Sequence, residues 1–265
     1  MKKIELVVFD WAGTMVDYGC NAPMAVFKEV FEEKGIHLTM AEISAPMGMG
    51  KKDHIRTLLQ TDNATNQWLQ QYGSSWKEAD VEEMYEKFQT LLFKRLKDYC
   101  TPIAGAIETV DWLRQNGIHV GSTTGYTKEM MEIVRPEAKL QGYETDYLVT
   151  SEIVGKGRPY PYMLFENMRH FGVMSTQSVI KVGDTVTDIL EGLNAGVWSV
   201  GVVKGSNLAG ITPETEATFS EQEKAERYQK AREAFQKAGA NYIIESISDL
   251  PDLIKKINQD LMGGC

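Results

Sequence analysis

Cysteine is scarce in this 265-residue sequence. The three cysteines lie far apart, at Cys20, Cys100 and Cys265, and none belongs to a C-x-x-C pair. Three cysteines cannot all pair internally, and this spacing indicates neither a disulfide framework nor a zinc knuckle. A protein that does without disulfides suits a reducing compartment, so we expect it in the cytoplasm.

Long hydrophobic runs are lacking as well. The first ten residues carry two lysines, but Glu5 and Asp10 accompany only a few apolar positions, so no signal peptide is indicated, and no run could span a membrane. The net charge of −9 argues against a nucleic-acid binder that neutralises phosphates over a broad surface. We expect a soluble protein without nucleic-acid or membrane partners, in which a small anionic substrate would need a local basic pocket.

The composition is otherwise that of a globular protein, with 43% hydrophobic and 25% charged residues. Residues 4–9 are a short run of mostly branched apolar residues, typical of a buried parallel strand. Residues 22–99 carry apolar residues at helical spacing, which indicates a helical insertion. Strands and helices then alternate, which predicts an α/β fold with a parallel sheet. The predicted strands are 118–122, 147–150, 178–182, 199–203 and one beginning at 240, and the predicted helices are 103–115, 128–140, 161–170, 188–194 and 214–239.

Polar residues gather where the predicted strands end. They occupy residues 10–14, 122–125 and 183–188, and Arg158 stands in the loop before the helix at 161. Ligands bind beyond the carboxyl ends of the strands in sheets of this kind, so we expect these side chains to meet. The sequence therefore predicts a site of acids, hydroxyls, glycines and one cation.

These residue types suit chemistry at phosphorus. Asp10 and Asp184 could share one Mg²⁺, a hard cation that takes few carboxylates and keeps waters or substrate oxygens. Asp10 could then attack phosphorus as a nucleophile. Thr124, backbone N–H groups and Arg158 could hold the non-bridging oxygens, and Asp188 could orient the metal's water shell. A plainer interpretation, that the acids only cap loops, weakens when several motifs occur in order.

The spaced motifs D-x-x-G-T, T-G and G-D-x-x-x-D resemble those of the haloacid dehalogenase superfamily of aspartyl-phosphate hydrolases. The resemblance implies a Rossmann-like parallel-sheet core with an inserted α-helical cap domain. The core would comprise residues 1–20 and 100–265, and the cap residues 21–99.

Ala12 departs from the superfamily pattern. Most of its phosphatases carry a second acid two residues after the nucleophile, which protonates the leaving group. An ordinary phosphate ester would therefore leave poorly here, unless another acid substitutes. The alternative is a carbon leaving group, for which a lysine imine is a good electron sink. Lys51 follows a glycine turn, with His54 on the same helical face, although a solvated Lys51–Lys52 pair is the plainer interpretation.

Longer segments of the sequence are similar to those of the phosphonatase branch of the superfamily. The matching segments are residues 10–20, 46–54, 122–127, 157–161 and 182–188. This resemblance implies hydrolysis of the carbon–phosphorus bond of phosphonoacetaldehyde to acetaldehyde and phosphate, through an imine on Lys51 and an aspartyl-phosphate on Asp10. It also implies a homodimer formed through the cap.

The resemblance further implies roles for individual residues. One Mg²⁺ per subunit would be bound by Asp10, the backbone carbonyl of Ala12 and Asp184, with Asp188 nearby. The phosphonate would be held by Thr124, Gly125 and Arg158. The lysine site would be lined or tuned by Met47, Cys20, Tyr126 and His54. For these last four, simple packing, or for His54 a hydrogen bond to a helix carbonyl, is the alternative.

Lys51 must be neutral to attack an aldehyde, so we expect burial under the cap and the neighbouring Lys52 to lower its pKa. We also expect the cap to close over the site. Apolar cap positions such as Phe27, Val30 and Phe31 would suit a dimer interface as well as a core. Two other functions stay open, a phosphomonoester phosphatase with a different acid and a non-catalytic phospho-ligand-binding relative.

Overall fold

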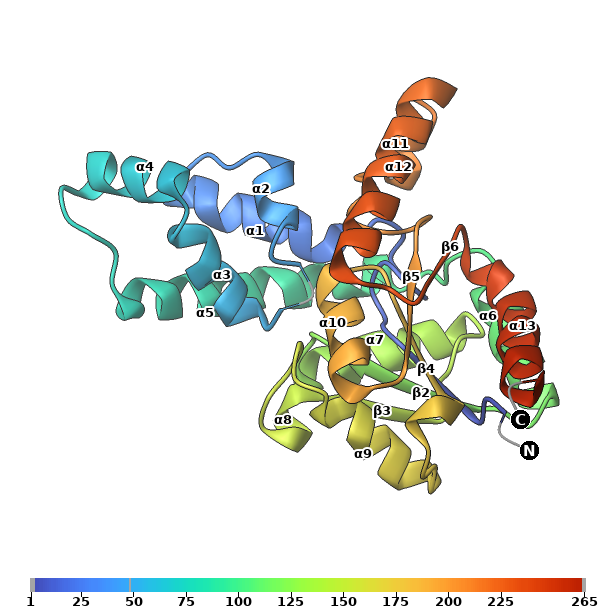
Figure 1. Cartoon of the computed structure of the whole chain (residues 1–265). Helices are drawn as coiled ribbons and strands as arrows, with labels where there is room; N and C mark the ends of the chain where they lie inside the picture. Colours follow the sequence, from blue (N-terminus) through green and yellow to red (C-terminus); the bar gives the residue numbers. More distant parts are fainter. Residues whose placement is uncertain (1–2, 48, 264–265) are drawn as a thin grey trace.

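A six-stranded parallel sheet lies at the centre of the computed structural model, which describes residues 3–47 and 49–263 (Figure 1). Gly48 of the glycine turn and Cys265 lie outside the described residues. The strand order is β3-β2-β1-β4-β5-β6, so the chain's first strand lies in the middle. The strands are β1 (Leu6–Phe9), β2 (His119–Thr124), β3 (Tyr147–Thr150), β4 (Val179–Gly183), β5 (Trp198–Val202) and β6 (Tyr242–Ile244). The predicted α/β class is confirmed.

Helices cover both faces of the sheet because successive side chains of β1 point to opposite sides. Val7 and Phe9 pack into the larger core beneath α6, α7 and α13, whereas Leu6 and Val8 pack against α9. The helices of the first face are α6 (Ala106–Gln115), α7 (Lys128–Leu140) and α13 (Leu250–Gly263). Those of the second face are α9 (Tyr162–Phe171), α10 (Val186–Ala195) and α12 (Glu221–Ala238). Short elements are α8 (Ser151–Val154), α11 (Pro213–Glu216), η1 (Leu96–Tyr99), η2 (Thr176–Ser178) and η3 (Ile247–Asp249).

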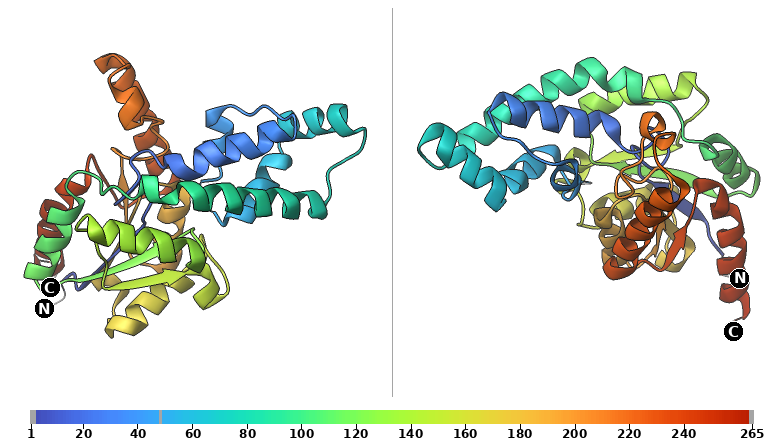
Figure 2. Two further views of the ribbon diagram at one scale, coloured as in Figure 1. Left: turned by 180° about the vertical axis from the view of Figure 1, so that it is seen from behind. Right: turned by 90° about the horizontal axis from the view of Figure 1, so that it is seen from above.

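Five helices between β1 and α6 form a separate group beside the sheet (Figure 2). They are α1 (Asn21–Glu33), α2 (Met40–Ser44), α3 (Lys51–Leu59), α4 (Asp62–Tyr72) and α5 (Glu78–Arg95). Phe27 stacks on Phe88 with ring centroids 4.3 Å apart, and Val30 and Phe31 are buried in the same hydrophobic cluster, which continues to Val7 and Phe9 of the sheet. These α1 positions are therefore buried within the chain, and the homodimer stays a prediction.

The boundaries of several elements differ from the predicted ones. β2 continues to Thr124 and β4 to Gly183, so Thr124 belongs to a strand and not to the loop after it. The single helix predicted over 214–239 is two, because Ser220 begins α12 with a capping box that it forms with Glu223. Helix α13 was not predicted. It ties the start of the chain to its end through a 2.7 Å hydrogen bond from the Ile4 amide to Asn258.

Within the described residues, every helix falls short of the length or the apolar character that crossing a bilayer requires.

Candidate active site

The ends of β1, β2 and β4 bring the predicted acids together. Strand register sets Phe9 opposite both Ser122 and Val182, so Asp10 comes level with the next residue of each neighbouring strand. Asp184 directly follows β4, and Asp188 lies in the first turn of α10. Asp10, Asp184 and Asp188 are all buried, and oxygens of the three carboxylates lie within 4.8 Å of one another.

The D-x-x-G-T segment is shaped around Asp184. Gly13 has a positive φ of 86°, and a Cβ atom there would collide with the Asp184 carboxylate. Only glycine combines that backbone conformation with so close an approach. The Thr14 hydroxyl donates to Asp184 Oδ1 at 3.3 Å, and the Asn207 amide donates to Oδ2 at 3.1 Å. The D-x-x-G-T motif thus makes room for the Asp184 carboxylate through Gly13 and hydrogen-bonds it through Thr14, although Asp184 lies 170 residues further along the chain.

Arg158 is buried, and its guanidinium contacts three carboxylates. Its Nη2 donates to Asp10 Oδ1 at 2.7 Å, and Nη1 lies 3.0 Å from Asp188 Oδ1. Its Nε donates to Glu191 at 3.1 Å. A guanidinium held by three carboxylates keeps a fixed direction beside Asp10.

Lys181 and Glu191 also belong to the site, and neither was predicted from the sequence. The Lys181 ammonium lies 2.9 Å from Asp188 and 3.3 Å from Glu191, and it donates to the Thr123 hydroxyl at 2.9 Å. A usable signal was present, because a lysine inside the otherwise apolar strand β4 requires buried acidic partners. Glu191 follows Asp188 by three residues and so lies on the same helical face.

The buried cluster has more negative than positive charge. Its four carboxylates, at Asp10, Asp184, Asp188 and Glu191, face two cations, Arg158 and Lys181. Burial raises the pKa of Asp184 well above its usual range, and the like charges of Asp10 and Asp188 add to the effect. Burial acts in the same direction on Asp188, but Arg158 and Lys181 outweigh it and leave the pKa of Asp188 lowered. A divalent cation beside Asp10 and Asp184 would balance the excess charge, so the residues present fit one.

Lys51, at the start of α3, lines a cavity together with Asp10. It is only 6% exposed, and its ammonium lies 5.3 Å from the Tyr126 ring centroid and 6.0 Å from that of Phe27. Burial lowers the pKa of Lys51, and the charge of Arg158 contributes, against opposing effects of Cys20 and Asp10. The interpretation as a solvated Lys51–Lys52 pair is therefore wrong for Lys51.

Lys52 is not among the main causes of the lowered pKa of Lys51. Lys52 points to the surface and pairs with Glu82, because adjacent helical residues face in different directions. The cation that lowers the pKa of Lys51 is Arg158, contributed by the core.

A small cavity of about 20 Å³ joins the two halves of the site. It is lined by Asp10, Ala12, Cys20, Lys51, Thr124, Gly125, Tyr126, Arg158 and Thr185. Burial raises the pKa of both Cys20 and Tyr126 well above the usual range, so both are protonated at neutral pH. Met47 and His54 are buried but do not line this cavity.

His54 packs against Phe27, whose ring also lies near the Lys51 ammonium. Its ring lies 3.9 Å from that of Phe27, and its Nε2 is 2.8 Å from the Ile43 carbonyl of α2, in agreement with the helix-carbonyl interpretation. Burial, with the charge of Lys51 as a lesser cause, lowers the pKa of His54 to about 3. The imidazole is therefore neutral at neutral pH, and Nδ1 is buried without a hydrogen-bond partner among the described residues.

We expect His54 to destabilise the fold in acid. The unfolded chain binds a proton near the ordinary value of 6.5, whereas the folded chain resists protonation down to about 3. Stability is therefore lost as pH falls from about 6.5 towards 3, by at most about 1.4 kcal/mol per pH unit from this residue. Urea unfolding between pH 7 and 4 should show a shallower decline for His54→Gln than for the wild type. Parallel curves would contradict the assignment.

The loop that carries Lys51 is attached to the core beside the acidic cluster. Thr187 of α10 donates to the Met47 carbonyl at 3.1 Å, and the Asn207 side chain donates to the Ser44 carbonyl at 3.3 Å. Asn207 also bonds Asp184 through its backbone amide. The placement of Lys51 is thus coupled to the residues that hold the carboxylates.

Comparison with known proteins agrees with this geometry. Residues 4–196 match the haloacid dehalogenase-like hydrolase family. The chain is 48% identical over 257 residues to a phosphonoacetaldehyde hydrolase of Bacillus cytotoxicus, covering 97% of each protein. It is 46% identical to a bifunctional phosphonoacetaldehyde hydrolase/aminoethylphosphonate transaminase of Clostridioides difficile; the match covers 98% of this chain but only 41% of that protein.

A solved structure extends the comparison to three dimensions. The crystal structure of a phosphonoacetaldehyde hydrolase like protein from Oleispira antarctica superposes with a TM-score of 0.94 at 36% identity, covering 99% of this chain and 95% of that one. The chain therefore belongs to the phosphonoacetaldehyde hydrolase family, within the haloacid dehalogenase-like hydrolases.

Proposed function

We propose that this protein hydrolyses the carbon–phosphorus bond of phosphonoacetaldehyde to acetaldehyde and phosphate. The observation that carries the proposal is one cavity lined by a buried carboxylate, Asp10, and a buried amine, Lys51, with Ala12 where ester hydrolases carry an acid. Such a cavity combines a nucleophile for phosphorus with an electron sink for carbon. The family relatives bear names for the same activity.

Lys51 starts the reaction. Its lowered pKa leaves a larger share of the amine neutral, and the Nζ lone pair adds to the aldehyde carbon. Loss of water gives an imine whose protonated nitrogen withdraws electrons from the adjacent carbon. The aromatic rings of Tyr126 and Phe27 flank the ammonium and suit a delocalised cation.

Asp10 then attacks phosphorus. As the new oxygen–phosphorus bond forms, the carbon–phosphorus bond breaks, and its electron pair moves into an enamine on Lys51. Thr124, Gly125 and Arg158 hold the non-bridging oxygens in this proposal, and Arg158 already donates to Asp10. Protonation of the enamine carbon and hydrolysis of the imine release acetaldehyde. Water cleaves the aspartyl-phosphate and releases phosphate.

The charge balance of the cluster supports one Mg²⁺ per subunit. Asp10, the backbone carbonyl of Ala12 and Asp184 would hold it, and Asp188, already engaged by Arg158 and Lys181, would orient its waters. When bound, the ion offsets the repulsion between the carboxylates and the anionic substrate.

The insertion's role follows from Lys51. We assign residues 21–99 to a cap domain and residues 1–20 and 100–265 to the core, with the cap placing Lys51 and excluding water. Cys20 and Tyr126 line the cavity with Lys51, whereas Met47 and His54 are buried outside its lining. A homodimer formed through the cap and a cytoplasmic location remain predictions.

Turnover of phosphonoacetaldehyde tests the function directly. We expect equimolar acetaldehyde and phosphate with Mg²⁺ present, loss of turnover after chelation with EDTA, and recovery when Mg²⁺ is restored. Phosphate release and acetaldehyde reduction can be followed in separate coupled assays. If sugar phosphates are hydrolysed faster, and Lys51→Arg does not affect that rate, the protein is a phosphomonoester phosphatase.

A further inference from the structure

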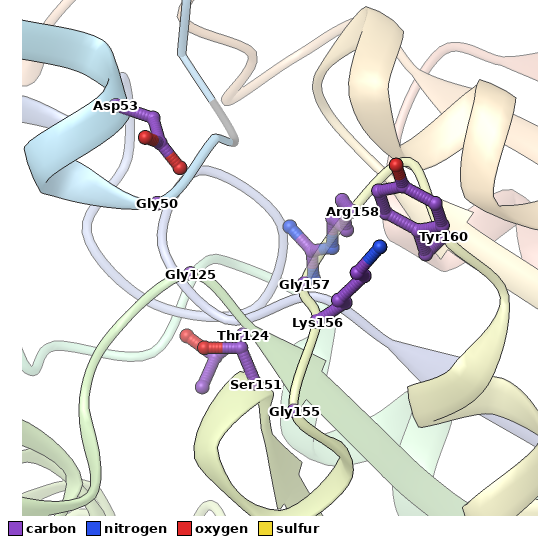
Figure 3. Close-up of a pocket in the computed structure, with 10 residues that line it drawn as sticks. All are labelled: Gly50, Asp53, Thr124, Gly125, Ser151, Gly155, Lys156, Gly157, Arg158 and Tyr160. Atoms are coloured by element: carbon purple, nitrogen blue, oxygen red, sulfur yellow. The ribbon is translucent and has the colours of Figure 1, made fainter. Parts of the chain in front are cut away.

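A second, larger hollow opens beside the catalytic cavity. Its volume is about 380 Å³, and it shares Thr124, Gly125 and Arg158 with the small cavity (Figure 3). The small cavity has room for roughly one water molecule. The larger space, which we call the outer pocket, is thus the neighbouring space with room for a phosphonate beside Arg158.

The outer pocket lies between the insertion and the core. Gly50 and Asp53 border it from the start of α3, and Ser151, Tyr160 and the loop 155–157 border it from the core. On the core side the lining includes Gly125, Gly155 and Gly157. Because glycine has no side chain, their backbone atoms are accessible to a small ligand.

Lys156 is the exposed cation of this pocket. Its ammonium lies 4.6 Å from the centroid of the Tyr160 ring, and the two side chains lie close together on the core side in Figure 3. Within the described part of the chain Lys156 forms no ion pair, whereas Asp53, the acid of this pocket, is paired with Arg56. The positive charge of Lys156 is therefore available to a ligand.

Lys156 and Arg158 lie two residues apart on one loop, the first exposed and the second buried. An anion bound at Lys156 would therefore lie in the same pocket that is lined by Arg158, whose guanidinium contacts Asp10. The protein as a whole carries a net charge of −9 and repels a dianion. A local cation at the mouth of the site counters that repulsion and raises the rate of productive encounter.

We propose that the outer pocket is the access site for the phosphonate group and that Lys156 binds the dianion there before Arg158 receives it. The inference rests on the proposed function for the identity of the substrate. Lys156 acts before the chemical step, so it contributes to kcat/KM and not to kcat. Its contribution is electrostatic, and salt screens it.

A charge series at position 156 tests the proposal. At low ionic strength we expect kcat/KM for phosphonoacetaldehyde to fall roughly fivefold in Lys156→Gln and further in Lys156→Glu, with kcat within about twofold of the wild type. Lys156→Arg should restore kcat/KM. The differences should shrink as NaCl rises towards about 0.5 M. Lys237→Gln, an exposed lysine on α12, is the matched control for the change in net charge.

Equal kcat/KM for Lys156→Gln and Lys237→Gln at every salt concentration would overturn the proposal. So would a loss in Lys156→Gln that salt does not reduce, because it would reflect structure and not charge. Binding of inorganic phosphate, measured by titration calorimetry without turnover, separates this inference from the proposed function. If phosphonoacetaldehyde is not a substrate but Lys156→Gln alone weakens phosphate binding, the anion site stands and the proposed function falls. Unchanged phosphate affinity in Lys156→Gln would refute the anion site.

Discussion

Asp10→Asn is expected to abolish turnover, by about 10⁴-fold or more, while leaving the protein folded. Asparagine has nearly the same shape, and its side-chain oxygen can still accept the hydrogen bond from Arg158. Its neutral amide, however, is a poor nucleophile and cannot form the acyl-phosphate. Steady-state assays with phosphonoacetaldehyde and circular dichroism would measure the two effects.

The same variant separates the two halves of the reaction. Imine formation needs Lys51 and not Asp10, so borohydride added with substrate should still trap an adduct on Lys51 in Asp10→Asn. Asp111→Asn, an exposed acid on α6, is the control for removing one negative charge. Retention of more than a few per cent of wild-type turnover in Asp10→Asn would exclude Asp10 as the nucleophile.

Lys51→Arg should lower kcat by about 10³-fold or more, because arginine keeps the positive charge but cannot form an imine. Without the imine, the carbon leaving group has no electron sink, and the carbon–phosphorus bond does not break. The borohydride adduct should disappear in the same variant, as peptide mass mapping would show.

Lys52→Arg is the matched control, one residue along the same helix. Its side chain pairs with Glu82 at the surface, so both turnover and the adduct should stay near those of the wild type. Near-normal turnover in Lys51→Arg would rule out the imine mechanism. An adduct on Lys52 would move the reactive amine to the neighbouring residue.

Much of the catalytic side of the site could be predicted from the sequence, because parallel strands end at one edge of their sheet. Acids placed directly after two strands had to lie close together, and the register of β1 with β4 brings Asp10 beside Asp184. Gly13 could be recognised as part of a motif, although its close approach to Asp184 could not.

The environment of the lysine could be predicted less well. Residues 51 and 52 are both lysine, and local sequence does not say which one faces inward. The packing of α3 against Phe27 and α5 decides it, burying Lys51 and leaving Lys52 half-buried in a surface ion pair with Glu82. The cation that lowers the pKa of Lys51 comes from a loop more than 100 residues away in the chain.

By itself, then, the sequence determined the α/β class, the helical insertion and the candidate reacting groups, since periodicity and strand ends are local properties. The tertiary structure alone decided how charge is balanced around them. It placed Lys181 and Glu191 beside Arg158 and left Lys156 at the surface. Burial and electrostatic interaction depend on distances between remote segments, and only the folded chain sets those distances.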